Sequence, residues 1–117
     1  MNIESFRTYC LSKPHATEHF PFDEDTLVFK ISDERMFALI SLSEADRVNL
    51  KCDPERAIEL RERFSAVQPG FHMSKKHWNT VFFNRELSDN ELFELIDHSY
   101  DLVYKKLPMK TKKLLPL

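Results

Sequence analysis

The residues most suited to chemistry lie in one short stretch, positions 69–83, with the sequence PGFHMSKKHWNTVFF. Its side chains that can carry a positive charge are His72, Lys75, Lys76 and His77, and its Trp78 is the only tryptophan of the chain. No aspartate or glutamate occurs anywhere from position 63 to position 85. Lysine can contact phosphate and tryptophan can stack on a base, so this stretch predicts a site for an anion or a partner surface.

Each of these residues also has a simpler structural explanation. Trp78 begins an apparent strand, so we expect its ring in the core rather than stacked on a base. Lys75 and Lys76 are equally well explained as an exposed turn or as a phosphate contact. Asn49 and Lys51 alternate outward on another predicted strand and can join the same surface. The candidate nucleic-acid-binding residues are therefore Lys75, Lys76, His77, His72, Lys51 and Asn49.

Other kinds of chemistry have weaker support in the sequence. His72 and His77 have no cysteine or aspartate ligand nearby, whereas zinc needs three or four convergent ligands, so we expect packed or turn-stabilising imidazoles. Cys10 and Cys52 fall on apolar faces, which favours core residues over nucleophiles. A single glycine cannot build a phosphate-binding loop. We expect no metal, no cofactor and no enzymatic activity.

Length and composition suggest one ordinary domain. The 117 residues are the usual size of a single domain, here 1–117, and the net charge of −2 argues against strong non-specific DNA binding. Residues 66–117 nevertheless carry 8 Lys/Arg and 6 Asp/Glu, a local charge of +2. No long apolar run occurs and the two cysteines form no CxxC motif, so we expect a reduced, cytoplasmic monomer without a membrane span.

The elements that must position these residues follow from the hydrophobic periodicity. Apolar residues recur at helical spacing in three segments, which are 2–13, 54–66 and 89–106. Five further segments are predicted to be extended, mostly because their apolar residues alternate with a period of two. They are 26–31, 36–42, 47–52, 71–73 and 78–84. Positions 14–25 read as a linker, and its Phe20-Pro21-Phe22 is expected to pack against the sheet edge. Short polar connectors favour antiparallel pairing. The order predicts an α+β two-layer sandwich, with one antiparallel sheet covered by helices on one face.

Three motifs connect the chain to a known family. They are Phe20-Pro21-Phe22 followed by LVFKI, then VNLKCDPERA from Val48, and above all PGFHMSKKHWNTV from Pro69. With these motifs in the same order, nearly the whole chain resembles the MmcQ/YjbR family of small bacterial proteins. The resemblance implies an α+β sandwich related to secretion chaperones and grouped with CyaY-like domains. It also implies the DNA-binding label that the family often carries, but no established reaction.

Two functional hypotheses follow. The first is a DNA-binding or regulatory domain in which Lys75, Lys76 and His77 contact phosphate with modest, salt-dependent affinity. The second is a non-catalytic interaction module that holds a segment of a partner protein, as secretion chaperones do. The second has its own support in segment 36–42, where both faces of the predicted strand are mostly apolar. A contiguous positive face favours nucleic acid, whereas an exposed apolar patch favours protein.

Overall fold

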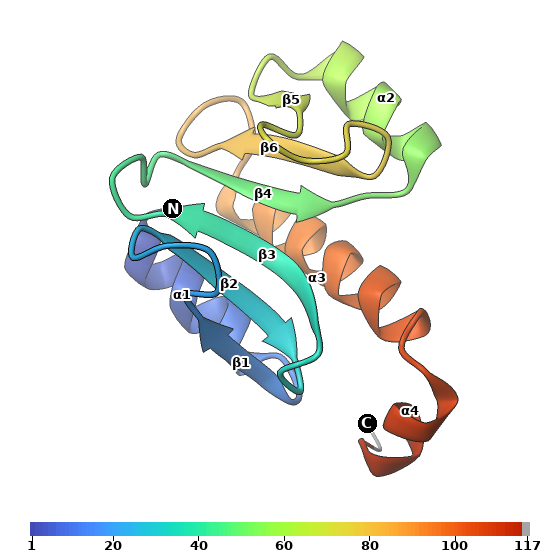
Figure 1. Ribbon diagram of the computed structural model, residues 1–117. Helices are drawn as coiled ribbons and strands as arrows, with labels where there is room; N and C mark the ends of the chain where they lie inside the picture. Colours follow the sequence, from blue (N-terminus) through green and yellow to red (C-terminus); the bar gives the residue numbers. More distant parts are fainter. Residues whose placement is uncertain (116–117) are drawn as a thin grey trace.

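The structure is a computed structural model that describes residues 1–115. Its elements, in chain order, are α1 (Ile3–Ser12), β1 (Ala16–His19), β2 (Thr26–Ile31), β3 (Arg35–Ser41), β4 (Arg47–Lys51), α2 (Pro54–Arg63), β5 (Val67–Pro69), β6 (Trp78–Phe82), α3 (Asp89–Lys105) and α4 (Met109–Leu114). Figure 1 shows the strands side by side with α3 crossing behind them. Among the described residues, no helix is long and apolar enough to cross a membrane.

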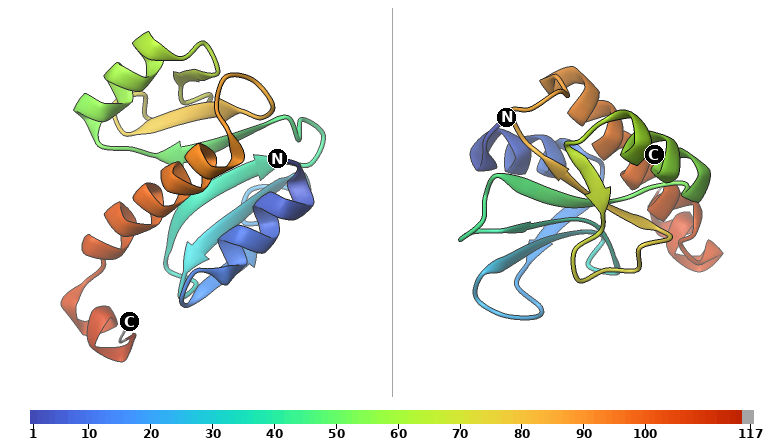
Figure 2. Two further views of the ribbon diagram at one scale, coloured as in Figure 1. Left: turned by 180° about the vertical axis from the view of Figure 1, so that it is seen from behind. Right: turned by 90° about the horizontal axis from the view of Figure 1, so that it is seen from above.

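The strands form one six-stranded sheet in the order β1-β2-β3-β4-β6-β5, and every neighbouring pair is antiparallel. The right-hand view of Figure 2 places α1, α2 and α3 on one side of this sheet. The same view shows the β1–β2 and β5–β6 loops projecting from the opposite side. The predicted α+β architecture, with one antiparallel sheet and helices on one face, is confirmed.

Two details of the predicted sheet were wrong. The expected linker contains β1, whose residues Ala16 to His19 pair with Ile31 to Val28 and add a sixth strand. The extended piece expected at 71–73 is a turn, and the short strand before β6 is instead Val67–Pro69. His72 has a left-handed backbone with φ of 60°, which a continuing strand could not accommodate.

Helix ends follow local chemistry. Asp53 accepts a hydrogen bond from the Arg56 N–H, and Pro54 occupies the first position of α2. Ser88 and Glu91 form the predicted capping box of α3. Helix α2 ends at Arg63 rather than at the predicted 66, because the backbone turns extended at Phe64 on its way to β5.

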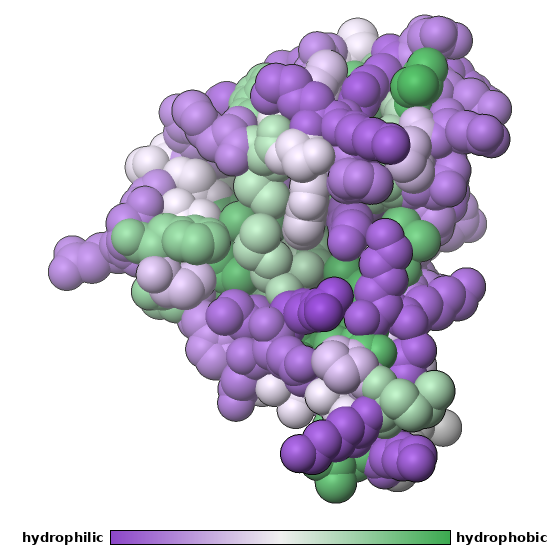
Figure 3. Space-filling model, turned by 45° about the vertical axis from the view of Figure 1, so that its right-hand side comes forward, coloured by the Kyte–Doolittle hydropathy of each residue, from purple (hydrophilic) through white to green (hydrophobic). Residues whose placement is uncertain are grey.

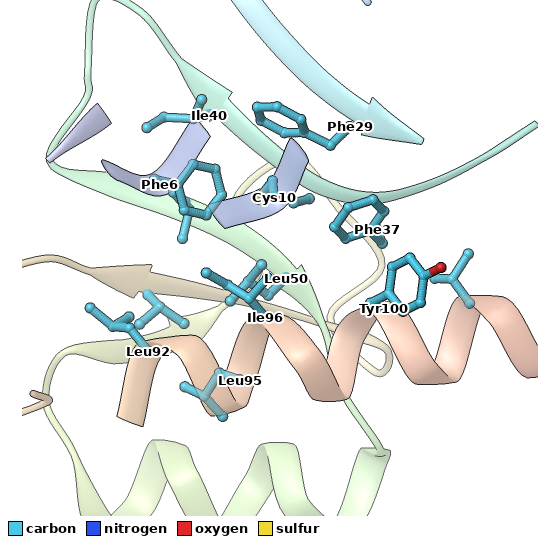
Figure 4. Close-up of a cluster of buried hydrophobic side chains, with 14 of the residues drawn as sticks. Phe6, Cys10, Phe29, Phe37, Ile40, Leu50, Leu92, Leu95, Ile96 and Tyr100 are labelled. Atoms are coloured by element: carbon cyan, nitrogen blue, oxygen red, sulfur yellow. The ribbon is translucent and has the colours of Figure 1, made fainter. Parts of the chain in front are cut away.

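The main core lies between the sheet and the helices (Figure 4). Phe6 meets Phe29 edge to face at 5.7 Å, and Phe37 meets Tyr100 in the same way at 5.3 Å. Both cysteines are buried free thiols, and burial raises the pKa of Cys52 to about 11. A thiol with so high a pKa is mostly protonated at neutral pH, which fits the predicted core role better than a nucleophilic one.

Helix α3 is also bonded directly into the sheet through Ser99, which is fully buried. The Ser99 hydroxyl donates to the Phe37 carbonyl at 2.5 Å and accepts from the Lys51 N–H at 2.9 Å. These bonds occur where β3 and β4 stop pairing with each other, since their register ends at Ala38 and Leu50. The helix therefore supplies hydrogen bonds that the neighbouring strand does not.

Candidate binding groove

The helix-free face of the sheet is hollowed between the two projecting loops. The hollow has a volume of about 510 Å³, within the range of ligand-binding pockets, and a smaller hollow of about 100 Å³ shares several of its lining residues. We call the combined feature the groove; its principal lining residues are Phe22, Met36, Leu39, Asn49, Phe71, His72 and Met73. Figure 3 shows apolar and pale side chains across the middle of the molecule, framed by hydrophilic ones.

The groove floor belongs to a second, smaller apolar cluster. Val28, Leu39 and Trp78 pack together there, with Met36 and Met73 against them. Trp78 is only 8 % exposed, which confirms the prediction that its ring is a core residue. Strand β3 is therefore apolar on both faces because each face covers a different cluster.

A closed set of hydrogen bonds attaches the β5–β6 loop to the sheet. The Phe71 N–H donates to Thr80 Oγ1 at 2.8 Å, and that hydroxyl donates to Asn49 Oδ1 at 2.5 Å. Asn49 Nδ2 then donates back to the Phe71 carbonyl at 3.2 Å. Asn49 and Thr80 are cross-strand partners in β4 and β6, so the sheet itself holds Phe71 at the groove wall.

The same loop is closed further out by two cations. The Lys75 ammonium donates to the Gly70 carbonyl at 2.7 Å. Arg61 on α2 donates to Asn79 Oδ1 at 2.7 Å, to the Trp78 carbonyl at 3.2 Å, and to the Lys75 carbonyl. The loop also needs glycine at position 70, because a Cβ there would lie 2.8 Å from the Trp78 Cβ and 2.9 Å from its carbonyl oxygen.

The six residues predicted to bind nucleic acid do not converge on one anion site. His72 and Asn49 line the groove. Lys75 and Lys76 are exposed, as predicted, but the Lys75 ammonium already bonds within its own loop. His77 is half-buried, and its carbonyl accepts from the Cys52 N–H at 2.8 Å. Lys51 lies beyond Asn49 at the far end of β4.

Sequence reasoning did not identify several of the groove residues. The expectation that Phe20 and Phe22 pack against the sheet edge was wrong, since their rings are 49 % and 64 % exposed. Phe22 instead forms one wall of the groove, opposite Phe71, which is 37 % exposed. The one available signal was the apolar character of both faces of segment 36–42, because it implies a second apolar surface without a helix to cover it.

Comparison with known proteins settles the family. The YjbR family model matches residues 11–102. The chain belongs to the YjbR family. It is 34 % identical to the uncharacterized protein YjbR of Escherichia coli K12 over 116 residues, covering 98 % of both chains. It is also 34 % identical over 76 residues to the uncharacterized protein YyaQ of Bacillus subtilis, covering 65 % of this chain and 63 % of that one.

Solved structures of similar proteins share this fold. The crystal structure of Deinococcus radiodurans protein DR2400 matches with a TM-score of 0.89 and 40 % identity, over 98 % of this chain and 88 % of that one. A crystal structure of a protein from Pseudomonas syringae matches with a TM-score of 0.75 and 30 % identity, over 88 % of this chain and 99 % of that one. The resemblance noted from the sequence motifs is thus confirmed as family membership.

Proposed function

We propose that this YjbR-family chain is a non-catalytic binding domain whose groove holds an extended, apolar segment of a partner protein. The observation that carries the proposal is the apolar floor of the groove, formed by Leu39, Met36 and Met73 between two exposed aromatic walls, Phe22 and Phe71. Burying one large aliphatic side chain on such a floor is worth about 1.5–3 kcal/mol. Methionine side chains adapt readily to different occupants, which suits a surface that binds peptide segments.

The acidic side chains at the groove favour a protein segment over nucleic acid. Three carboxylates border one end of the groove, namely Asp23 and Asp25 from the β1–β2 loop and Glu44 from the β3–β4 loop. Hydrogen bonds from the Thr26 and Asp25 N–H groups lower the pKa of Asp23, and bonds from Ser41 and Ser43 lower the pKa of Asp25. Both carboxylates therefore stay ionised at neutral pH and repel phosphate.

The nucleic-acid hypothesis relied on the turn at 75–77. There the Lys75 ammonium donates a hydrogen bond to the Gly70 carbonyl of its own loop. Among the described residues, the Lys76 ammonium has neither an ion pair nor a hydrogen-bond partner. One lysine without an organised neighbour gives weak phosphate binding. The two hypotheses thus predict that binding depends on different residues. A protein segment would need the apolar residues of the groove, whereas nucleic acid would need the lysines of the loop.

A selection experiment separates them. The full chain is panned against a displayed library of short random peptides, and a selected peptide is titrated into isotope-labelled protein. We expect amide shifts at Leu39, Asn49 and Met73, and loss of binding in Phe71→Ser and Met73→Ser but not in the control Lys76→Ala.

The nucleic-acid arm uses a DNA duplex and a single-stranded RNA under the same conditions. Salt-dependent binding of either oligonucleotide that Lys76→Ala weakens, together with no peptide enriched on the groove, would overturn the proposal. Groove-directed peptide binding without oligonucleotide binding would support it.

A further inference from the structure

The two ends of the groove differ in charge, and this follows from strand register. Strands β3 and β4 run antiparallel along the floor, with Ile40 opposite Val48 and Ala38 opposite Leu50. The start of β3, at Met36, therefore lies toward the end of β4, at Lys51. The end of β3, at Ser41, lies toward the start of β4, at Arg47. Each end of the groove is thus flanked by a different set of side chains.

The acidic end comprises Asp23, Asp25 and Glu44. Asp23 lines the groove beside Thr26, which pairs with Ser41. Asp25 bonds to the Ser41 hydroxyl at 2.5 Å and to the Ser43 N–H at 2.9 Å. Two arginines lie at this end. Arg47 is already paired with Asp46 at 2.8 Å and with Glu44 at 3.7 Å, and Arg85 stacks over the Phe82 ring at 4.0 Å. The end keeps a net negative charge.

The basic end is marked by Lys51, with Arg35 and Lys106 close to it on the helix side of the sheet. Lys51 pairs with Trp78 of the floor cluster and alternates with core residue Leu50, so its side chain leaves the sheet on the groove side. Within residues 1–115, none of the three cations forms an ion pair or donates a side-chain hydrogen bond. Burial, and then the charges of Lys106 and Arg35, lower the pKa of Lys51. Such a group of like charges is relieved by an incoming anion.

We infer that the groove binds its segment in one direction, with an acidic side chain of the segment at the basic end and a basic side chain at the acidic end. This inference rests on the proposed function and specifies its partner. From Arg47 to Lys51 is about 13 Å, at about 3.3 Å per residue of extended chain. An extended segment spans that distance in four residues, so the two charges fall at positions i and i+4 with the apolar anchor at i+2. All three side chains then face the sheet, because side chains alternate along a strand.

Three synthetic peptides test this inference on the full chain. The first has glutamate, leucine and lysine at alternate positions with serine between them, the second has the reverse order, and the third has glutamine in place of both charged residues. Each carries a nitroxide at its amino end, and amide broadening in the protein locates that end. We expect the first peptide to broaden signals near Lys51 and the second to broaden signals near Ser43 and Glu44.

A matched substitution checks the role of the basic end. Lys51→Met keeps the apolar stem and removes the charge. We expect it to weaken binding of the two charged peptides by about two- to fivefold, as for exposed ion pairs, and to leave the glutamine peptide unchanged. Added salt should reduce the same difference.

The outcomes separate this inference from the proposed function. If no peptide shifts the amides of Leu39, Asn49 and Met73, the groove is not a peptide site and both proposals fail. If all three peptides bind there in one common orientation and Lys51→Met binds them equally well, the groove is a peptide site but the charge-set direction is wrong. Orientation that reverses with charge order supports the inference.

Discussion

The Thr80 hydroxyl of β6 donates to the Asn49 side chain of β4 at 2.5 Å, directly across the sheet from strand to strand. The same hydroxyl accepts the Phe71 N–H at 2.8 Å, so one oxygen serves both the sheet and the loop that walls the groove. Thr80 is 1 % exposed, so its hydroxyl is shielded from bulk water. The shape of the groove therefore depends on a single buried hydroxyl.

Replacing that hydroxyl should weaken both stability and binding. Thr80→Val preserves the shape but leaves the Phe71 N–H and Asn49 Oδ1 unpaired, and we expect a loss of about 1–3 kcal/mol in the free energy of unfolding. Urea denaturation measures it. Thr80→Ser retains the hydroxyl and should lose clearly less. Equal stability of the valine variant and the wild type would show that the hydroxyl network contributes nothing.

Trp78 should contribute strongly to stability. Trp78→Ala removes a large ring from the cluster that forms the groove floor, and we expect a cost of about 3–5 kcal/mol, as for other large-to-small core substitutions. Thermal or urea unfolding reports the change. Lys76→Ala, two positions earlier and exposed, should stay within about 0.5 kcal/mol of the wild type. An unchanged unfolding midpoint for Trp78→Ala would contradict the buried position.

Gly70 should tolerate no side chain. A Cβ at position 70 would lie 2.8 Å from the Trp78 Cβ, 2.9 Å from the Trp78 carbonyl and 3.1 Å from the Met73 Cβ. We expect Gly70→Ala to cost about 1–3 kcal/mol, as overpacking does, and to shift the amide signals of Met73 and Trp78. Ser74→Ala, at an exposed position of the same loop, is the control. A fully stable Gly70→Ala variant with unchanged spectra would show that the loop adapts without strain.

His98 should make stability depend on pH. Its Nε2 accepts the Asp53 N–H at 3.1 Å, which joins α3 to the cap of α2 and requires a neutral ring. Burial, followed by the Arg56 charge, lowers the pKa of His98. The folded state then binds its proton less readily than the unfolded chain. The stabilisation is therefore fully present above the ordinary imidazole pKa of about 6.5, and it is lost as the pH falls through the lower folded value.

Denaturation curves at pH values between about 5 and 8 measure this effect, a range that spans the titration of histidine. His98→Gln should flatten the dependence, whereas His15→Asn, at an exposed position with a left-handed φ of 61°, should leave it intact. A wild-type slope that survives His98→Gln would assign the dependence to another group.

Most of the fold could be predicted because the hydrophobic periodicity and the helix-capping residues are visible in the sequence. In β4, the apolar residues Val48 and Leu50 alternate with polar residues, as in a strand with one buried face. Ser88 and Glu91 form a capping-box pattern that predicts the start of α3. Strand β1 could not be predicted, since Ala16 to His19 has one apolar residue and depends on pairing with β2. Long-range pairing of this kind overrides weak local preference.

The groove was harder to predict than the fold. His72 and Asn49 were candidates for phosphate contact, yet they meet because Asn49 bonds to the carbonyl of Phe71, a contact across 22 positions of sequence. Phe22 joins them from a further segment that local reasoning assigned to packing at the sheet edge. A site assembled by sheet order from separate loops leaves no contiguous motif, so the sequence drew attention to the lysine turn instead.

The position of Ser99 bears on the order in which the chain assembles. The Lys51 amide bonds to a helix residue 48 positions later rather than to a neighbouring strand. Its protection from hydrogen exchange therefore reports whether α3 has docked, while the Val48 and Leu50 amides report strand pairing. In a refolding experiment sampled by pulsed exchange, protection at Lys51 arriving after protection at Val48 would mean that β4 pairs within the sheet before α3 docks on it. Simultaneous protection would make α3 part of the folding nucleus.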